Sequence, residues 1–398
     1  MTTIDEDGYL QAMADYFREG ETRAMALGNR GPARYTADGG LDPAILEAYD
    51  RYGFYVFQDV VAQPELGELQ AAYHALCERL PSEPDSQVDR AGRPALGTEQ
   101  RGHAVSWVKP LSDPYGAANA ARARQEAELQ GQDSGGFFSE RQQVGMYEPT
   151  PPAHLPDKVA TSIFAPLQYS DAFLRLYAHP DLMRISAAVN GDDFVPSNEA
   201  LVFKKAGEGA SVGWHQDGMT HWGSPDWHLR SHGFNFMVQL FGSTAANGVW
   251  YVLGSHAMGK ADIKAMIERA GTQMLPGAVP LVCNPGDLVI HNRQTIHCSW
   301  PNTGNDTRIT VNIAFMPRRS VFGFSGRPYL TDHDIEYDEN AIRNRARMIG
   351  YAIDARHRHF PDETPYSYRP HVEAGETFHW DEAARQASYG YQLHDLII

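Results

Sequence analysis

The stretch GWHQDG at residues 213–218 decides how the rest of this chain is interpreted. His215 and Asp217 lie two positions apart after an apolar run, and residues two apart in an extended chain point to the same side. One imidazole and one carboxylate can therefore converge on a metal ion. A second imidazole from a distant strand would complete a face of two histidines and one carboxylate, which is typical of Fe(II) oxygenases.

His297 is the best candidate for the second imidazole. Turn-forming residues fill positions 301–306, so we expect a hairpin that returns Arg308 to the side of His297. Arg308 opens an alternating run, 308–315, whose inner face would line a cavity. Its guanidinium is suited to binding a carboxylate through two hydrogen bonds, although an isolated arginine more often makes a structural ion pair. The combination indicates an oxygenase that consumes a 2-oxo acid.

The amino-acid composition limits the kinds of partner that the protein is expected to bind. Among 398 residues, 34 Lys and Arg stand against 50 Asp and Glu, a formal net charge of −16. That charge disfavours nucleic acid and anionic membranes, which require a basic face. No apolar run approaches the roughly 18 residues of a membrane span. With three cysteines and no secretory leader, we expect a cytoplasmic protein that acts on a small molecule, and a homo-oligomer is possible.

The order of elements predicts an antiparallel β core preceded by helices. We expect an amino-terminal helical extension over 1–40, an oxygenase domain over 41–330, and a carboxy-terminal extension over 331–398 that packs on the core or on a partner subunit. Helices are predicted at 5–29, 43–52 with Asp42 as cap, 64–80, 117–129, 172–190 split at His179-Pro180, 261–270 and 340–356. Strands are predicted at 54–57, 198–204, 234–241, 249–253, 287–291 and 308–316.

An ordered set of short motifs resembles the phytanoyl-CoA dioxygenase family of Fe(II)/2-oxoglutarate oxygenases. The resemblance covers roughly residues 43–318, and the set is far more specific than any single motif. Its members are GFYVF at 53–57, HPDL at 179–182, FK at 203–204, HQD at 215–217, NG at 247–248, LGSH at 253–256, PGD at 285–287, HCS at 297–299 and Arg308.

The resemblance implies a mainly β protein with flanking helices around a double-stranded β-helix, the jelly-roll or cupin-like core. It implies that His215, Asp217 and His297 hold Fe(II), and that Arg308 and Ser299 bind the distal carboxylate of 2-oxoglutarate, with Gln216 reaching the same co-substrate. O₂ would be consumed, with succinate and CO₂ as co-products. A carboxylate at position 217 favours hydroxylation over halogenation, since a small residue there would open a position for halide.

The substrate pocket is predicted on the loop after the metal motif and on neighbouring strands. Its candidates are Asn198, Met219, His221, Trp222, His228, Arg230 and Gln239. They favour a small polar metabolite or a natural-product intermediate. His291 competes with His297 for the metal but its spacing to Arg308 fits the family poorly, and His256 is predicted to be structural. A non-catalytic β-barrel binding protein and a zinc hydrolase are the alternative functions.

Overall fold

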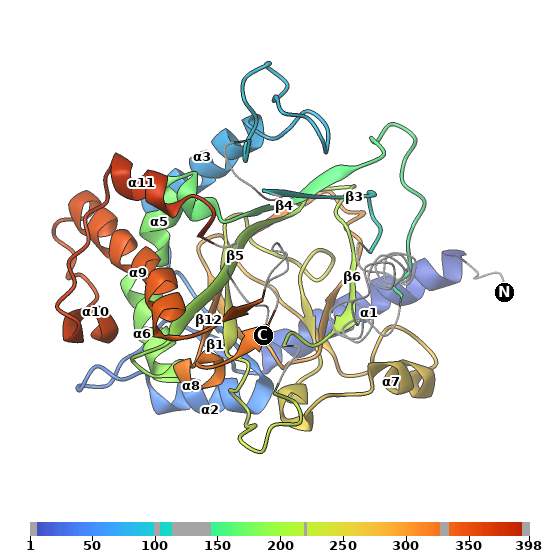
Figure 1. Cartoon of the computed structure of the whole chain (residues 1–398). Coiled ribbons are helices and arrows are strands. Elements are labelled where there is room, and N and C mark those ends of the chain that lie inside the picture. The colour runs from blue at the N-terminus through green and yellow to red at the C-terminus, as the bar shows by residue number, and fades with distance from the viewer. Residues whose placement is uncertain (1–5, 99–103, 114–144, 219–220, 327–333, 392–398) are drawn as a thin grey trace.

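The computed structural model describes residues 6–98, 104–113, 145–218, 221–326 and 334–391. Two sheets face each other (Figure 1), and their strands pair antiparallel except for the parallel pair of β1 and β2. The larger sheet contains β1 (Arg30–Gly31), β2 (Phe54–Phe57), β10 (Leu288–Asn292), β7 (Phe234–Gln239), β12 (Arg308–Met316), β5 (Val195–Lys204), β4 (Val159–Phe164) and β3 (Val105–Val108), in that order. The smaller sheet contains β6 (Val212–His215), β11 (His297–Ser299), β8 (Trp250–Tyr251) and β9 (Val279–Pro280).

The path of the chain between the sheets identifies the architecture. From β5 to β12, the chain moves back and forth between the larger and the smaller sheet. The order β10-β7-β12-β5 then faces the order β6-β11-β8-β9. Two four-stranded layers filled in this alternating way form a double-stranded β-helix. The predicted fold is therefore confirmed.

Helices cover the outer face of the larger sheet. The helices are α2 (Pro43–Tyr52), α3 (Glu65–Glu78), α5 (Asp171–Tyr177), α6 (Pro180–Asn190) and α9 (Glu339–His359), and Figure 1 shows α5, α6 and α9 together beside β5 and β12. On β12, Ile309, Val311 and Ile313 enter the apolar core beneath these helices. The alternate residues, beginning with Arg308, therefore face the interior of the barrel.

Local sequence sets the ends of the predicted helices. The Asp42 side chain caps α2 by accepting a hydrogen bond from the backbone N–H of Ala44, and Pro43 occupies the first turn. The helix ends at Gly53, whose φ of 84° is readily adopted by glycine. The predicted split at His179-Pro180 is confirmed, because α5 ends at Tyr177 and α6 begins at Pro180.

The outer face of the smaller sheet is covered by α1 (Glu6–Ala26) and α7 (Ile263–Ala270). The Tyr16 ring stacks on Trp250 with centroids 4.4 Å apart, and the Tyr16 hydroxyl donates to the Leu275 carbonyl oxygen at 2.8 Å. The amino-terminal helix is therefore built into the layer behind β8 and β6. The boundaries of the three predicted domains stay a prediction.

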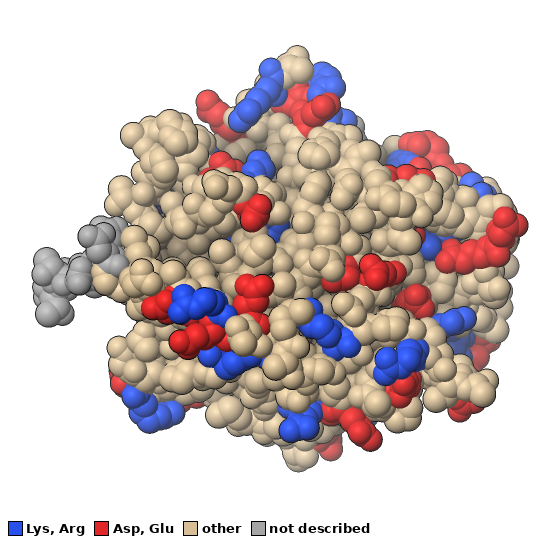
Figure 2. Space-filling model, turned by 180° about the vertical axis from the view of Figure 1, so that it is seen from behind, with Lys and Arg blue, Asp and Glu red and all other residues tan. Residues whose placement is uncertain are grey.

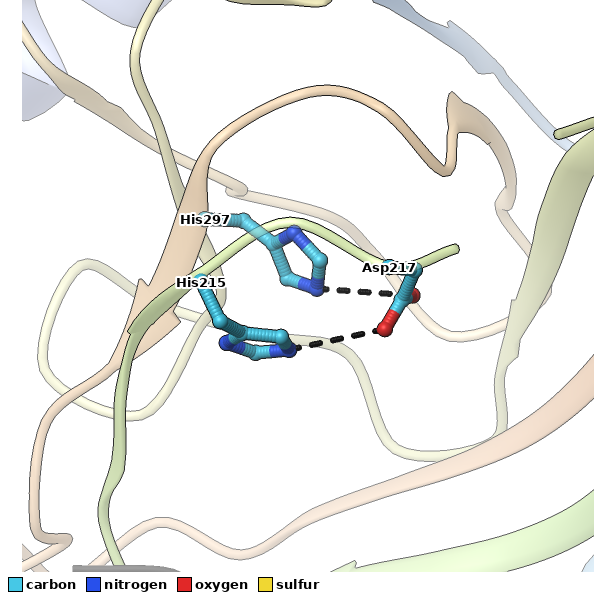
Figure 3. A group of neighbouring side chains, drawn as sticks. All are labelled: His215, Asp217 and His297. Carbon is cyan, nitrogen blue, oxygen red and sulfur yellow. Dashed lines mark ion pairs between the residues drawn. The ribbon is translucent and has the colours of Figure 1, made fainter. Parts of the chain in front are cut away.

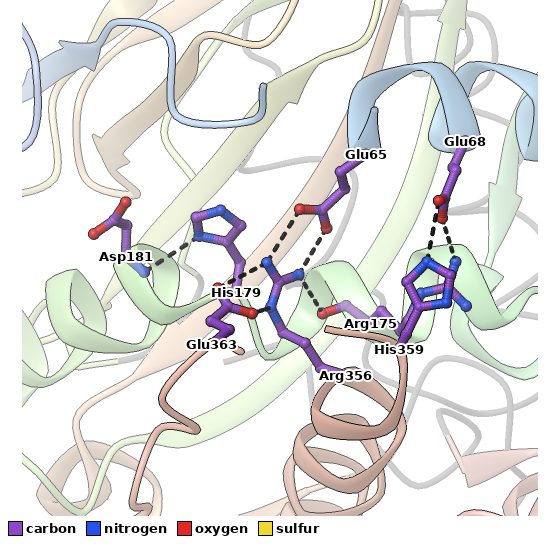
Figure 4. A network of polar contacts seen from close by, with 8 residues as sticks. All are labelled: Glu65, Glu68, Arg175, His179, Asp181, Arg356, His359 and Glu363. Atoms are coloured by element: carbon purple, nitrogen blue, oxygen red, sulfur yellow. Dashed lines mark hydrogen bonds and ion pairs between the residues drawn. The ribbon is translucent and has the colours of Figure 1, made fainter. Parts of the chain in front are cut away.

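The carboxy-terminal part adds α8 (Arg318–Val321), β13 (Ser325–Gly326), β14 (Ile335–Glu336), α9, α10 (Arg369–Glu373) and α11 (Glu382–Ser388). An ion-pair network ties α9 to the amino-terminal half (Figure 4). The Arg356 guanidinium binds Glu65 of α3 at 2.7 Å and Glu363 at 2.6 Å, and it donates to the Arg175 carbonyl oxygen at 3.2 Å. Helix α9 therefore packs on the core of the same chain.

Two strands were missed, one predicted hairpin is wrong, and one predicted helix lies outside the described residues. Strands β3 and β4 were not predicted, because proline, glycine and charged residues dominate the sequence around them. The expected hairpin between His297 and Arg308 is wrong, because β11 belongs to the smaller sheet and β12 to the larger one. The turn at 301–306 instead carries the chain across the barrel. The predicted helix at 117–129 lies outside the described residues.

The surface mixes both signs of charge. On the face shown in Figure 2, acidic and basic side chains are interspersed among uncharged ones. In the described part of the chain, none of the helices has the length and apolar character needed to cross a membrane.

Candidate metal centre

His215, Asp217 and His297 meet in the barrel. Their ligand atoms all lie within 4.8 Å of one another, and all three residues are buried. The Nε2 atoms of His215 and His297 lie 3.6 and 3.7 Å from the two carboxylate oxygens of Asp217, and Figure 3 shows both rings directed toward that carboxylate. These gaps are too long for hydrogen bonds but leave room for an ion between the atoms.

The sheet register creates this meeting point. His297 on β11 is the direct cross-strand partner of His215 on β6, so the two imidazoles leave the same face of the smaller sheet. Tyr251 pairs with His297 from the other side and extends the row. Asp217 follows β6 by two residues and returns its carboxylate to the same face.

Hydrogen bonds select the nitrogen that each imidazole offers. Nδ1 of His215 lies 2.7 Å from the Gly213 carbonyl oxygen, and Nδ1 of His297 lies 2.8 Å from the Thr295 carbonyl oxygen. A carbonyl oxygen only accepts, so each Nδ1 carries the proton and each Nε2 presents a free electron pair. Burial also lowers the pKa of His297 well below its usual value. Both rings therefore have the form that binds a metal.

Two neighbours position the carboxylate. Nδ2 of Asn235 on β7 donates to Oδ2 of Asp217 at 2.9 Å. Gly218 follows with a φ of +90°, and a Cβ atom there would lie 2.4 Å from the His232 ring. Any other residue at position 218 would therefore strain the turn that directs Asp217 inward.

A pair of buried cations lies on the opposite wall. Arg308 on β12 pairs directly with Lys204 on β5, while Ile309 and Phe203 beside them enter the apolar core. Both cations therefore point into the barrel. Burial lowers the pKa of Lys204 well below its usual value, with a further contribution from Arg308, and burial lowers the pKa of Arg308 to about 10.

Lys204 links this wall to the metal side. Its Nζ atom donates to the hydroxyl of Ser299, which follows His297 by two residues on β11. In the described part of the chain, neither Lys204 nor Arg308 has a carboxylate within ion-pair distance, and Nε and Nη1 of Arg308 have no partner. The predicted pair of Arg308 and Ser299 therefore shares one region, and Lys204 is a third member that sequence reasoning missed.

Further polar atoms along the barrel interior are buried and have no partner among the described residues. They are the Gln239 amide, the Thr310 and Tyr251 hydroxyls, Oδ1 of Asn312 and Nδ1 of His291. Gln239 and Thr310 are cross-strand partners, and Thr310 follows Arg308 by two residues. Unpaired buried polar groups are costly, so this interior is suited to a polar ligand with several hydrogen-bonding groups.

The Gln216 side chain binds the backbone in this structure, and its role toward 2-oxoglutarate stays a prediction. Its Nε2 donates to the carbonyl oxygens of Gly259 and Gln294, and its Oε1 accepts from the backbone N–H of Ala261. Both amide protons are therefore engaged with the backbone. Gln216 fixes the segment between the two metal-facing residues.

Two predicted substrate contacts anchor the loop after the metal motif. The Arg230 guanidinium binds the Asp50 carboxylate of α2 through two nitrogens, with a shortest distance of 2.6 Å. Nδ1 of His228 accepts from the backbone N–H of Arg230, and its Nε2 contacts the Arg319 guanidinium of α8. Both side chains are held by neighbouring residues, and their roles toward a substrate stay predictions.

The other predicted pocket residues differ in their surroundings. The ring centroids of Trp222 and His232 lie 4.5 Å apart, and those of His221 and Phe324 lie 5.7 Å apart. Asn198 is exposed on β5. Gln239 is fully buried deeper in the barrel. Met219 lies outside the described residues. The roles of Asn198, His221, Trp222 and Gln239 toward a substrate stay predictions.

His291 and His256 lie near the centre but outside the triad. The His291 ring is 5.1 Å from that of His297, and burial lowers its pKa to about 4. Nε2 of His256 lies 2.9 Å from the Asp50 carbonyl oxygen. His256 therefore supports the join between α2 and the barrel, as expected of a structural histidine.

Comparisons with known proteins give one family match and several similar solved structures. Residues 149–310 match the family model described as Phytanoyl-CoA dioxygenase (PhyH). A comparison with curated proteins finds no match. Similar solved structures include EctD from S. alaskensis with bound Fe, at 18% identity and a TM-score of 0.45, covering 72% of this chain and 81% of that one. They also include AviO1 from Streptomyces viridochromogenes, at 20% identity and a TM-score of 0.41, covering 69% and 94%.

A buried triad of two histidines and one carboxylate is the ligand set that non-haem Fe(II) oxygenases use. The family match over residues 149–310 confirms the predicted resemblance to the phytanoyl-CoA dioxygenases. The matched segment contains His215, Asp217, His297 and Arg308.

Proposed function

We propose that this protein is an Fe(II)/2-oxoglutarate-dependent hydroxylase of a small polar metabolite or natural-product intermediate. One observation carries the proposal. A triad with free Nε2 electron pairs lies on the inner face of the smaller sheet, and the inner face of the larger sheet carries an arginine that has no carboxylate partner among the described residues. A zinc hydrolase would use the triad but has no need for that arginine.

Different residues would bind the metal and the co-substrate. Nε2 of His215, Nε2 of His297 and the Asp217 carboxylate would hold Fe(II), while Arg308 and Ser299 would bind the distal carboxylate of 2-oxoglutarate. Bound iron and 2-oxoglutarate supply the activation of O₂, with release of succinate and CO₂ and insertion of one oxygen atom into a substrate C–H bond. The buried walls exclude water and so protect the reaction from side products.

Polar side chains near the triad support a polar and uncharged substrate. On adjacent strands, Asn312 and Asn235 share the face that carries Arg308, as the strand alternation and register require. Asn198 lies at the exposed part of β5, where the pairing with β12 shifts register. Amide groups both donate and accept hydrogen bonds, so they are suited to hydroxyl or amide groups. We also propose a cytoplasmic location, with self-association left to a measurement of mass in solution.

Turnover tests the proposed function. Protein loaded with Fe(II) should convert 2-oxoglutarate to succinate in air, and a true substrate from a panel of small polar compounds should accelerate the conversion. His297→Ala should abolish it. Binding of panel compounds without any succinate would indicate the β-barrel binding protein, and hydrolysis with bound zinc would indicate the hydrolase.

A further inference from the structure

We infer that a hollow at the edge of the larger sheet, beside β3, binds a small phosphorylated ligand that carries a planar ring, the chemistry of a nucleoside monophosphate. The hollow has a volume of about 710 Å³, and small-molecule sites in proteins generally have roughly 300–1,000 Å³. Its lining includes Trp107, Lys109, Asp157, Lys158 and four prolines. None of the lining residues belongs to the triad or its surroundings, so the inference does not depend on the proposed function.

The strand register brings two lysines together in this hollow. β3 is the last strand of the larger sheet and pairs with β4 (Figure 1). Val108 and Val159 form the final pair of the two strands. Lys109 follows Val108 and Lys158 precedes Val159, so the two lysines leave the end of the strand pair next to each other. Both side chains are exposed, and both line the hollow.

The charge of this lysine pair is not balanced by the protein. In the part of the chain that the structure describes, neither Lys109 nor Lys158 has a carboxylate within ion-pair distance. Like charges on opposite strands repel each other, and an anion bound between them removes that repulsion. A lysine ammonium is a compact point charge that binds phosphate, whereas the planar fork of arginine is suited to carboxylates. The pair therefore favours a phosphate group.

Trp107 offers a surface for a ring. It lies two positions before Lys109, so both side chains leave β3 on the same side. The indole is half-buried, it lines the hollow, and no ring or cation from the described residues stacks on it. Planar bases stack on aromatic side chains of this kind whatever their sequence. A ligand with its phosphate at the lysines can therefore place a ring on Trp107.

Asp157 adds a hydrogen-bond acceptor to the lining. Its carboxylate is exposed and, among the described residues, has no ion-pair partner. An ionised carboxylate only accepts hydrogen bonds, so it disfavours a second anionic group and favours an N–H group. The amino group of a nucleobase is such a donor. Asp157 thus favours a nucleotide over a phosphorylated ligand whose ring has no N–H group.

One segment of the chain lies between the hollow and the metal strand. Ser112 lines the hollow, and the next residue, Asp113, accepts a hydrogen bond from the backbone N–H of Gly213 on β6 at 2.9 Å. Leu111 just before them has a φ of 60°, which non-glycine residues rarely adopt. Such conformations cluster in segments that bind ligands. The hollow is therefore a space of its own outside the barrel.

Calorimetric titration with three probes tests the inference. The full chain, with and without Fe(II) and in the absence of oxygen, would be titrated with AMP, with adenosine and with ribose 5-phosphate. AMP should bind with a dissociation constant below about 1 mM, and each of the other two should bind at least roughly tenfold more weakly, because each lacks one of the two groups. No binding of AMP, or equal binding of AMP and ribose 5-phosphate, would overturn the inference.

Variants assign the two groups of the ligand to their residues. Lys109→Met and Lys158→Met should each weaken binding of AMP and of ribose 5-phosphate roughly tenfold and leave adenosine unchanged. Trp107→Leu should weaken AMP and adenosine but leave ribose 5-phosphate unchanged, and that unchanged binding shows that the variant is folded. The exposed lysine variants should unfold at the same temperature as the wild type or a higher one.

Lys264 on α7 provides the matched control. It is exposed and lies 4.0 Å from the Glu268 carboxylate, far along the chain from the hollow. Lys264→Met removes the same charge and should leave AMP binding unchanged. An equal loss in Lys264→Met would mean that only the general charge of the protein matters. Loss of AMP binding in His215→Ala together with full binding in Lys109→Met would place the nucleotide at the metal centre. Either result would overturn the inference.

Discussion

At the scale of single residues, backbone carbonyls decide which histidines can serve a metal. Nδ1 of His215 and Nδ1 of His297 donate to the Gly213 and Thr295 carbonyl oxygens. In the part of the chain that the structure describes, Nδ1 of His291 has no partner. The orientation of a histidine ligand is generally fixed in this way by the hydrogen bond of its other nitrogen. Burial alone therefore does not identify a ligand, since all three rings are buried.

A pair of histidine variants tests this assignment. His297→Ala should abolish stoichiometric Fe(II) binding, because one of three ligands is lost, whereas His291→Ala should retain most of it. Metal content after anaerobic loading and desalting measures both. Retention by His297→Ala together with loss in His291→Ala would reverse the assignment of the distal ligand.

Asn235 should tune the metal through Asp217. Asn235→Ala removes the 2.9 Å hydrogen bond to Oδ2 and should weaken Fe(II) binding roughly tenfold or more, while the fold is kept. Asn312→Ala is the control, because Asn312 lies on the neighbouring strand and has no hydrogen bond to Asp217. Equal affinities in the two variants would show that the Asn235 bond does not position the carboxylate.

Lys204 should make the stability of the ligand-free protein depend on pH. Its pKa is lowered in the folded state, so the unfolded chain binds more protons and stability rises with pH up to the unfolded pKa of about 10.4. The stability difference between Lys204→Met and the wild type should therefore shrink as pH rises from neutral toward that value. Denaturant unfolding over this range measures it, and a difference independent of pH would contradict the shift.

At the scale of elements, α9 is tied to α3 through one arginine. The side chains of Arg356 and Glu65 are 7% and 12% exposed, and Glu363 binds the same guanidinium. A neighbouring pair, Arg175 with Glu68 at 2.6 Å, joins α5 to α3 (Figure 4). The helical layer behind the larger sheet is thus held by charges as well as by its apolar core, which keeps the barrel wall of β5 and β12 in place.

Removing that arginine should destabilise the whole layer. Arg356→Ala leaves Glu65 buried without a partner and should lower the free energy of unfolding by about 3 kcal/mol. Lys264→Ala breaks an exposed pair with Glu268 on α7 and should change it by less than about 0.5 kcal/mol. Chemical denaturation measures the free energy of unfolding of both variants. Equal losses would show that the buried network stabilises the fold no more than a surface ion pair does.

At the scale of the whole molecule, alternation along strands explains both the success and the limits of sequence reasoning. It placed His215 and Asp217 on one side of an extended chain, and the structure agrees. The same alternation directs Gln216 to the opposite side, so its engagement with the backbone could have been predicted from the residues alone.

Other features depend on contacts between distant strands. A lysine at a strand end is usually exposed, so nothing in the residues near Lys204 indicates that Arg308, 104 positions later, lies beside it. The hairpin expected after His297 was wrong for a related reason. A turn signal shows that the chain reverses direction, but it does not show which sheet the next strand joins.

The most direct measurement is the absorption of the Fe(II)-loaded protein in the absence of oxygen, before and after addition of 2-oxoglutarate. We expect a new charge-transfer band, because the keto acid can bind iron only if the triad leaves positions open and Arg308 holds its far end. A folded, iron-loaded protein whose spectrum does not change at saturating 2-oxoglutarate would contradict it.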